Sequence, residues 1–582
     1  MANVKNLFGM AVMATALVGC ASNDDITPNG NENESNKVGT AYAKFTIQLP
    51  TVSGTRAADP KTGTEFNGGT ADEYAVKDAQ LVIFEKTDAS KGEGDYKFVE
   101  TVNIGNLEPW TDNTPNTGVT RYTNITAQLN GVSLDKTGGK YYALIILNNG
   151  SQSKVKLPTS GTYSEWNVAN NAKSAADFLN SDNGFYMANA PLYSTGEPTT
   201  LVPIKGVYST KAEAQTNRAT TVYVERGMAK VTVSGSGSGS DFTINDPSST
   251  YNADMVKINN WTLDVLNKST FPVHATTGLT TDFPQIWKTE RFVATGSTPQ
   301  RVYWGKDPNY NKSPLTTVKE CQKEFYIVDN NGKTYNGDPS STFTWSANTT
   351  PLYCLENTFD LDNMKQGQTT RVVFKATYTP HNLISATDKT FFMIGNNTQI
   401  WTKDALVAQI TSKAKEMLKS TAVVVTIKDK APLLKGGSHL LSSADVTIED
   451  GSVDKTETFD FATLNTKLGL NNTEMDENNS PKVGIKTYEN GESYYIARIK
   501  HFNELTSWAS GQAYGSDNEK YLGRYGVLRN NWYDLTVTKF SAPGYPDVPV
   551  IDPKTPDDED TKYINVEVKI LDWAKRTQQV EL

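Results

Sequence analysis

The C-terminal end of the chain carries the pattern of one β-strand that no partner strand follows. Its apolar residues fall on one face with polar residues between them, which is the period-two pattern of a half-buried strand: Ile564, Val566, Val568 and Ile570. A Pro- and Asp-rich segment, residues 541–562, precedes this strand and is expected to form an extended, solvated arm. A strand tethered in this way is expected to pair with the sheet of another molecule.

The first 20 residues have the features of an export signal. Residues 7–18 form an apolar run that is too short to span a bilayer, and a positive charge at Lys5 precedes it. The run ends in Leu-Val-Gly-Cys, which resembles a bacterial lipobox, so Cys20 is expected to carry the lipid that holds the exported chain to a membrane. Residues 21–36 are polar and suit a flexible tether. The alternative is an uncleaved hydrophobic N-terminus with an incidental cysteine.

Composition restricts the class of protein. A chain of 582 residues with 37% apolar residues can form two or three domains with real cores. The net charge of −9 argues against nucleic acid as a partner, because no basic stripe is present to neutralise phosphates. Cys321 and Cys354 are the only cysteines after Cys20. They could form a disulfide in an exported protein, and two buried free thiols are the alternative.

Patterning along the chain predicts a mainly β fold with few short helices. Residues 42–49 alternate, with four apolar residues on one face: Ala43, Phe45, Ile47 and Leu49. Further strands are expected at residues 79–85, 141–147, 220–234, 256–266, 372–378, 422–428, 493–499 and 533–540. The GSGSGS run at residues 235–240 predicts a domain boundary. Helices are expected at residues 403–418, with Thr402 as N-cap, and at residues 172–179.

The sequence offers little catalytic chemistry. The chain has four histidines, and they lack the spacing of metal ligands: His274, His381, His439 and His501. Neither a metal nor another cofactor is therefore expected, and the chain is not expected to be an enzyme. Asp360 and Asp362 could serve a glycosidase only if they faced each other across a cleft. Tryptophans could line a sugar-binding surface, although β-sandwich cores use them routinely: Trp261, Trp287, Trp304 and Trp345.

Several sequence patches resemble the Bacteroidetes-type fimbrillins, in particular the shaft subunits of minor fimbriae. The patches are residues 185–192 (FYMANAPL), 223–233 (YVERGMAKVTV), 303–310 (YWGKDPNY), 353–358 (YCLENT), 529–537 (RNNWYDLTV) and 563–582. The resemblance implies a lipoprotein precursor of two tandem β-sandwich (transthyretin-like) domains. It further implies trimming by an arginine-specific surface protease and polymerisation by donor-strand exchange, in support of adhesion and biofilm formation.

These inferences divide the chain as follows: residues 1–20 signal peptide, 21–56 tether and removable strand, 57–234 N-terminal domain, 235–540 C-terminal domain, 541–562 linker and 563–582 donor strand. Cleavage between Arg56 and Ala57, in a loop of small and polar residues, would release both the lipid and the early strand. Lys61 is a weaker alternative site. The emptied groove would expose apolar surface and unpaired backbone, which the C-terminal strand of a neighbour could cover, lengthened by Trp573, Val580 and Leu582.

Several alternatives stay open. The C-terminal strand could fold back into its own subunit, because the linker is long enough. The chain could be a surface glycan-binding lipoprotein, a fimbrial tip adhesin or an anchor, or an enzyme on a β-sandwich.

The expected partners are other copies of the chain, fimbrial anchor and tip subunits, the protease, the outer membrane through lipid, and host or bacterial surface receptors. The expected location is the cell outer membrane for the precursor and then the surface fimbrium.

Overall fold

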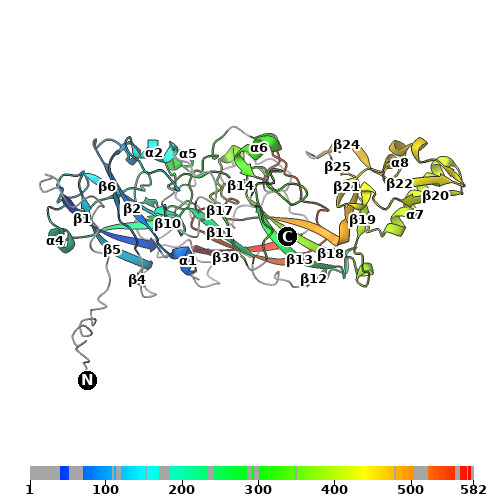
Figure 1. Ribbon diagram of the computed structural model, residues 1–582, viewed down its shortest axis with the longest axis horizontal. Coiled ribbons are helices and arrows are strands. Elements are labelled where there is room, and N and C mark those ends of the chain that lie inside the picture. Colours follow the sequence, from blue (N-terminus) through cyan, green and yellow to red (C-terminus); the bar gives the residue numbers. More distant parts are fainter. Residues whose placement is uncertain are drawn as a thin grey trace, which may run out of the picture.

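The computed structural model is an elongated molecule in which sheets follow one another along the long axis (Figure 1). The described residues are 40–50, 70–107, 111–112, 119–150, 154–169, 178, 184–233, 241–284, 287, 292–293, 300–312, 315–341, 343–347, 350–476, 480–501, 522–557, 564–572 and 574–577. Among them, no helix combines the length and the apolar character needed to cross a membrane.

A nine-stranded sheet occupies the end drawn in blue and cyan (Figure 1). Residues from both halves of its strand order share one core, including Phe45 and Ile47 from one half and Leu81 and Ile145 from the other. In spatial order the strands are β3 (Lys97–Asn103), β2 (Ala79–Glu85), β6 (Tyr141–Leu147), β7 (Met187–Asn189), β10 (Thr220–Arg226), β1 (Ala41–Pro50), β5 (Val119–Leu129) and β4 (Thr111–Asp112), with β9 (Val202–Pro203) beside β6.

The chain passes from this sheet to a second one at Gly227. A Cβ at this position would lie 2.8 Å from the Phe178 ring and 2.9 Å from the Tyr186 ring, so glycine permits the close crossing. The second sheet has five strands: β17 (Leu352–Leu355), β11 (Met228–Val233), β28 (Trp532–Phe540), β29 (Ile564–Asp572) and β30 (Ala574–Thr577).

A four-stranded sheet packs against the five-stranded one in the middle of the molecule. Both contribute to one core, for example through Val231 and Tyr533 on one side and Trp261 and Phe374 on the other. This is the arrangement of a β-sandwich. The four strands are β12 (Asp241–Thr243), β13 (Met255–Asp264), β18 (Arg371–Thr379) and β27 (Glu492–Arg498).

The segment between β18 and β27 in the sequence folds into a separate part, which forms the yellow end of the molecule (Figure 1). Its helix α7 (Lys403–Leu418) begins after Thr402, whose side chain accepts a hydrogen bond from the Ala405 amide, and it buries Leu406 and Ile410 in a core of its own. The predicted helix and N-cap are therefore confirmed. The other elements are α8 (Phe461–Lys467), β19 (Phe391–Ile394), β20 (Val423–Ile427), β21 (Gly437–His439), β22 (Val446–Asp450), β23 (Val453–Asp454), β24 (Asn471–Met475), β25 (Pro481–Val483) and β26 (Ile485–Tyr488).

The remaining elements are short. They are β8 (Leu192–Tyr193), β14 (Leu266–Asn267), β15 (Gln300–Arg301), β16 (Phe325–Tyr326), α1 (Ala71–Tyr74), α2 (Tyr163–Ala169), α4 (Lys211–Thr216), α5 (Leu279–Asp282), α6 (Val318–Glu324) and the 3-10 turns η1 (Glu93–Asp95), η4 (Leu361–Asn363), η5 (His381–Leu383), η6 (Pro432–Leu434), η7 (Thr456–Thr458) and η8 (Glu489–Gly491).

The mainly β fold predicted from the sequence is confirmed, and each predicted strand has a counterpart within a few residues: β1, β2, β6, β10 with β11, β13, β18, β20, β27 and β28. The predicted helix at residues 172–179 falls almost wholly outside the described residues. The number of domains and the boundary at residues 234 and 235 stay predictions.

Candidate functional site: the slot of β1 and the C-terminal strand

Strand β1 fills a slot in the interior of the nine-stranded sheet. Its odd-numbered residues point into the core, where Phe45 and Ile47 are fully buried and Leu49 is 4% exposed. The intervening residues, such as Lys44 and Gln48, are half-buried on the other face. The four apolar residues predicted on one face therefore lie together in the core, joined by Ala41.

Backbone pairing holds β1 on both sides. It runs parallel to β10, from Phe45 opposite Thr220 to Gln48 opposite Tyr223. It runs antiparallel to β5, from Ala41 opposite Leu129 onward. Removing β1 would thus leave two unpaired strand edges and an open apolar groove in the middle of the sheet.

Polar side chains add little to this hold. The Thr46 hydroxyl donates to the Asn124 side-chain oxygen at 2.7 Å, and the Lys44 ammonium donates to the Gln215 carbonyl at 3.0 Å. Because the slot recognises its strand through main-chain pairing and apolar side chains at alternate positions, another strand with the same alternation could fill it.

The C-terminal strand β29 has a partner in its own chain, so the expectation that it lacks one is wrong. It pairs antiparallel with β28, with Val566 opposite Val537 and Val568 opposite Leu535, and it turns into β30. β28 and β29 have nine residues each, so β29 can cover the edge of β28 along its whole length when the chain folds back. The four predicted donor residues Ile564, Val566, Val568 and Ile570 all lie on β29.

The linker before β29 is not a solvated arm through its described part, residues 541–557, which we call the strap. Val548 and Ile551 are 1% and 2% exposed. The Tyr545 amide and carbonyl pair with Tyr494 of β27, each at 2.8 Å. The prolines favour an extended strap. Val548 packs with Tyr494 and Ile496 of the four-stranded sheet, and Ile551 packs in a separate cluster with Cys321 and Phe325. The prediction from its composition was therefore wrong for this part.

Several predicted site residues cannot be placed. Cys20, Arg56 and Ala57 lie outside the described residues, and so do Lys61 and the trailing donor residues Trp573, Val580 and Leu582. Their predicted roles in lipidation, processing and donation stay predictions.

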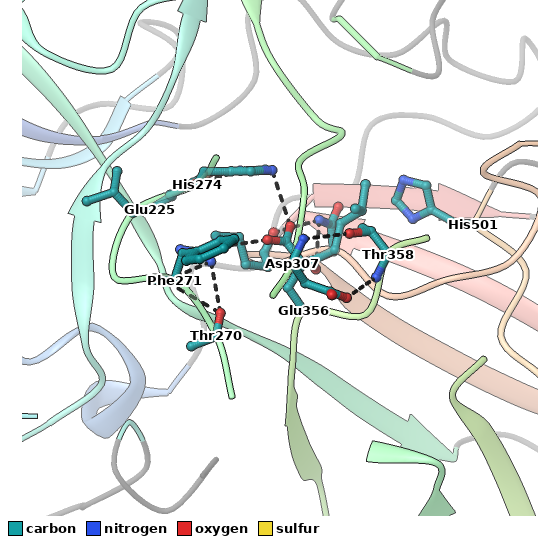
Figure 2. Close-up of polar contacts among 12 residues, drawn as sticks. Glu225, Thr270, Phe271, His274, Asp307, Glu356, Thr358 and His501 are labelled. Atoms are coloured by element: carbon teal, nitrogen blue, oxygen red, sulfur yellow. Dashed lines mark hydrogen bonds and ion pairs between the residues drawn. The ribbon is translucent and has the colours of Figure 1, made fainter. Parts of the chain in front are cut away.

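A buried polar junction joins the nine-stranded sheet to the central sandwich (Figure 2). His274 Nδ1 lies 3.0 Å from a Glu225 carboxylate oxygen, and its Nε2 lies 3.2 Å from a Glu356 carboxylate oxygen. Arg529 Nε donates to the other Glu356 oxygen at 3.1 Å. Burial raises the pKa of Glu225, but the charges of His274 and Arg301 outweigh burial and hold that pKa below its ordinary value. All of these groups except Arg301 have side chains at most 2% exposed, so no substrate can reach them.

A second buried pair ties helix α1 to the five-stranded sheet. The Lys230 ammonium lies 2.6 Å from a Glu73 carboxylate oxygen, and the Tyr353 hydroxyl donates to the same oxygen at 2.5 Å. The junction and the Glu73–Lys230 pair explain charges inside several of the patches named above, since Glu225, Glu356 and Arg529 belong to the junction and Lys230 belongs to the pair. Charged residues inside an otherwise apolar strand were the signal from which this junction could have been predicted.

The other candidate residues have packing roles. Asp360 caps η4 by accepting from the Asp362 and Asn363 amides, so the two acids do not face each other across a cleft. His381 contacts Asp254 at 2.7 Å, and His501 contacts the Tyr533 hydroxyl at 2.6 Å. Among the described residues, no group of three or more His, Cys, Asp or Glu side chains is placed to hold a metal ion.

The tryptophans and cysteines are also mostly interior. Trp261 and Trp304 are fully buried and Trp287 is 3% exposed, so these three do not line a sugar-binding surface. Cys321 and Cys354 are both buried free thiols. Burial raises the pKa of each thiol to about 12, which keeps both in the unreactive protonated form.

Residues 486–579 match the family model described as major fimbrial subunit protein type IV, fimbrillin, C-terminal. The matched stretch contains β27, β28, the strap and β29, which are the elements that carry the C-terminal strand and its present partner. The predicted resemblance to Bacteroidetes-type fimbrillins is confirmed by this match, and a fimbrial subunit is the class of protein that it supports.

Solved structures similar to this chain include a fimbrilin from Porphyromonas gingivalis, with 11% identity, a TM-score of 0.35, and coverage of 90% of this chain and 96% of that chain. The tip fimbrial protein Mfa3 of the same organism, with C-terminal truncation, has 10% identity, a TM-score of 0.27, and coverage of 93% and 100%. A fimbrial assembly protein from Parabacteroides distasonis has 14% identity, a TM-score of 0.27, and coverage of 62% and 94%. TM-scores this low carry no argument about this chain. No curated protein matches it.

Proposed function

We propose that the chain is a shaft subunit of a surface fimbrium that polymerises by donor-strand exchange. In this proposal β1 leaves its slot after cleavage, and the C-terminal strand of another copy takes its place. The observation that carries the proposal is the position of β1, an interior strand paired on both sides whose inward residues are all apolar.

The free energy gained by refilling an emptied slot favours the entry of another strand. Burying a large apolar side chain stabilises by about 1.5–3 kcal/mol, so refilling the slot of Phe45, Ile47 and Leu49 is worth roughly 5–9 kcal/mol before ordering costs. Two restored backbone ladders add to this. An emptied slot is consequently an acceptor for any strand that presents apolar residues at alternate positions.

The way β29 is held supports its role as the donor. In the main sheet it has β28 on one side, and its other neighbour is the short hairpin strand β30. It can therefore leave from the end of the sheet without opening the interior. The six residues between Asp557 of the strap and Ile564 can span about 20 Å when extended, which gives β29 room to swing.

The precursor steps complete the proposal. Lipid on Cys20 holds the exported chain at the outer membrane, and an arginine-specific protease cuts between Arg56 and Ala57. Arg56 lies only a few residues after the end of β1 at Pro50. After such a cut, β1 is retained by pairing and packing alone. The released subunit then joins the surface fimbrium, where adhesion and biofilm formation are its expected roles.

A disulfide lock tests the central step. Ala43 of β1 lies opposite Ala127 of β5, so Ala43→Cys with Ala127→Cys can tie β1 into its slot. We expect the oxidised variant to be cut by the protease and yet to form no filaments, and we expect a reducing agent to restore them. Electron microscopy and size-exclusion chromatography give the readout.

The matched control locks two strands that stay in place. Ile83 of β2 lies opposite Ala143 of β6, so Ile83→Cys with Ala143→Cys introduces the same bond into the same sheet. This variant should polymerise whether oxidised or reduced. Normal filaments from the oxidised β1 lock would contradict strand replacement and would mean that the chain polymerises without releasing β1.

A further inference from the structure

A row of three charged residues crosses the four-stranded sheet. Asp264 of β13 lies opposite Arg371 of β18, and Arg371 lies opposite Arg498 of β27. Residues directly opposite on neighbouring antiparallel strands share a face, so the two arginines lie side by side. Two like charges in this position destabilise a sheet unless each has a counterion.

The first arginine has its counterion. Arg371 Nε and Nη2 each lie 2.8 Å from the same Asp264 carboxylate oxygen. Nη2 also donates to the Pro549 carbonyl of the strap at 2.5 Å. With side chains at most 2% exposed, this pair is dry and complete.

The second arginine has none. Arg498 is 6% exposed, and its Nε, Nη1 and Nη2 atoms have no hydrogen-bond partner among the described residues. Asp557 contributes a favourable charge from nearby, but its carboxylate accepts from the Thr369 hydroxyl at 3.1 Å and makes no hydrogen bond to Arg498. A buried cation without a partner costs several kcal/mol, so the row is one anion short.

Arg498 lines a cavity of 510 Å³ between the strap and the β24–β25 hairpin. This volume suits a small organic molecule. Five basic and three acidic side chains line it, and the basic ones include Arg498, Arg371 and Lys482. Ile496 and Tyr545 supply apolar surface, and Ser480 supplies a hydroxyl.

We propose that this cavity binds a small carboxylate of about the size of an acidic monosaccharide, with its carboxylate group paired to the Arg498 guanidinium. A carboxylate accepts two parallel hydrogen bonds from a guanidinium, which would give Arg498 a counterion like the one that Asp264 gives Arg371. The apolar and hydroxyl lining fits the rest of such a molecule. Burial and the nearby Asp476 raise the pKa of Asp547 in the wall to about 7, so this group carries only part of its charge against an anion at neutral pH.

Titration calorimetry with glucuronate tests the site, and glucose serves as the uncharged probe. We expect the wild type to bind glucuronate but not glucose. We expect Arg498→Met to weaken glucuronate binding about tenfold or more, because a charge-assisted pair is lost. Lys257→Met removes an exposed charge of β13 from the same sheet and should leave binding unchanged.

Thermal unfolding without ligand gives an independent readout. Because Arg498 is an unpaired buried charge, Arg498→Met should unfold at the same temperature as the wild type or higher. A clear drop would mean that Arg498 has a partner within the chain and would overturn the proposal. So would wild-type binding of inorganic phosphate without glucuronate, absence of glucuronate binding, or equal binding by Arg498→Met. The site is remote from β1 in the strand order, so these outcomes leave strand exchange untouched.

Discussion

At the scale of single residues, pairs of buried charges connect the sheets of the molecule. Glu73 with Lys230, and Glu225 and Glu356 with His274, each connect elements far apart in the sequence. Such pairs contribute little net free energy of folding compared with apolar packing, but breaking one partner leaves a buried charge uncompensated. Loss of one partner should therefore destabilise the contact between α1 or β10 and the central sandwich.

Lys230→Met should lower the free energy of unfolding by about 3–5 kcal/mol, because it strands the Glu73 carboxylate in the interior. Lys230→Met combined with Glu73→Leu should recover much of this loss. Urea unfolding followed by fluorescence reports on the site, since the Lys230 ammonium lies 3.9 Å from the centre of the Trp532 ring. As a control, Lys435→Met removes a pair with an exposed lysine and should cost less than about 1 kcal/mol. Equal losses for the two single variants would contradict the argument.

Asp307 should make stability fall as the pH rises toward neutrality. Burial raises its pKa to about 7, against the hydrogen bonds from the Thr358 and Asn309 amides, whereas the unfolded chain has the ordinary value near 4. The folded state therefore binds more protons between about pH 4 and 7, and its advantage is lost across that range, by at most ~1.4 kcal/mol per pH unit.

Asp307→Asn mimics the protonated acid and should flatten this dependence. The thermal midpoint should fall less between pH 5 and pH 8 in the variant than in the wild type. The midpoint of the wild type relative to that of the variant should therefore be highest at pH 5. Parallel slopes for the two proteins would show that Asp307 ionises as it does in water.

At the scale of elements, β1 and β29 are both alternating strands but are held differently. β1 is paired on both sides in the interior of its sheet, whereas β29 and its hairpin partner β30 form the end of one. A terminal hairpin exchanges partners more readily than an interior strand, so in the proposed exchange cleavage is needed to free β1 and not to free β29.

Val566→Asp with Val568→Asp should abolish filaments while leaving a folded, trimmed monomer. Two carboxylates would enter an apolar groove, at a cost that cancels most of the gain from refilling it. Asn565→Asp with Lys569→Gln changes the net charge equally on the other face of the strand and should polymerise. A chain that ends at Asp560 should behave like the first variant by size exclusion and electron microscopy. Filaments from that shortened chain would point to fold-back as the only role of β29.

At the scale of the whole molecule, the slot of β1 lies in the sheet at one end, and the strap fixes the start of β29 to the central sandwich (Figure 1). Under the proposed strand exchange, a chain that accepts at one place and donates from another would make a head-to-tail contact, which would grow into an open filament. The rigid part between the slot and the strap would then set the repeat along the fimbrium.

Arg56→Ala should leave the precursor uncut after residue 56 and unpolymerised, because β1 stays covalently joined to the rest of the chain. N-terminal sequencing and intact mass of the surface protein give the readout, with wild-type chains expected to begin at Ala57. Assembled chains that begin upstream of Arg56 would contradict activation by cleavage. Lys61→Ala is the control and should assemble normally.

The sequence by itself determined the local elements of this protein. The alternation of β1, the apolar run of β2 and the Thr402 cap of α7 are encoded within a few neighbouring residues, because side-chain direction in strands and helices follows the backbone period. Only the tertiary structure decided which elements meet. The partner of β29, the packing of the strap through Val548 and the lack of a hydrogen-bond partner for Arg498 among the described residues depend on residues distant in sequence, and no local period records them.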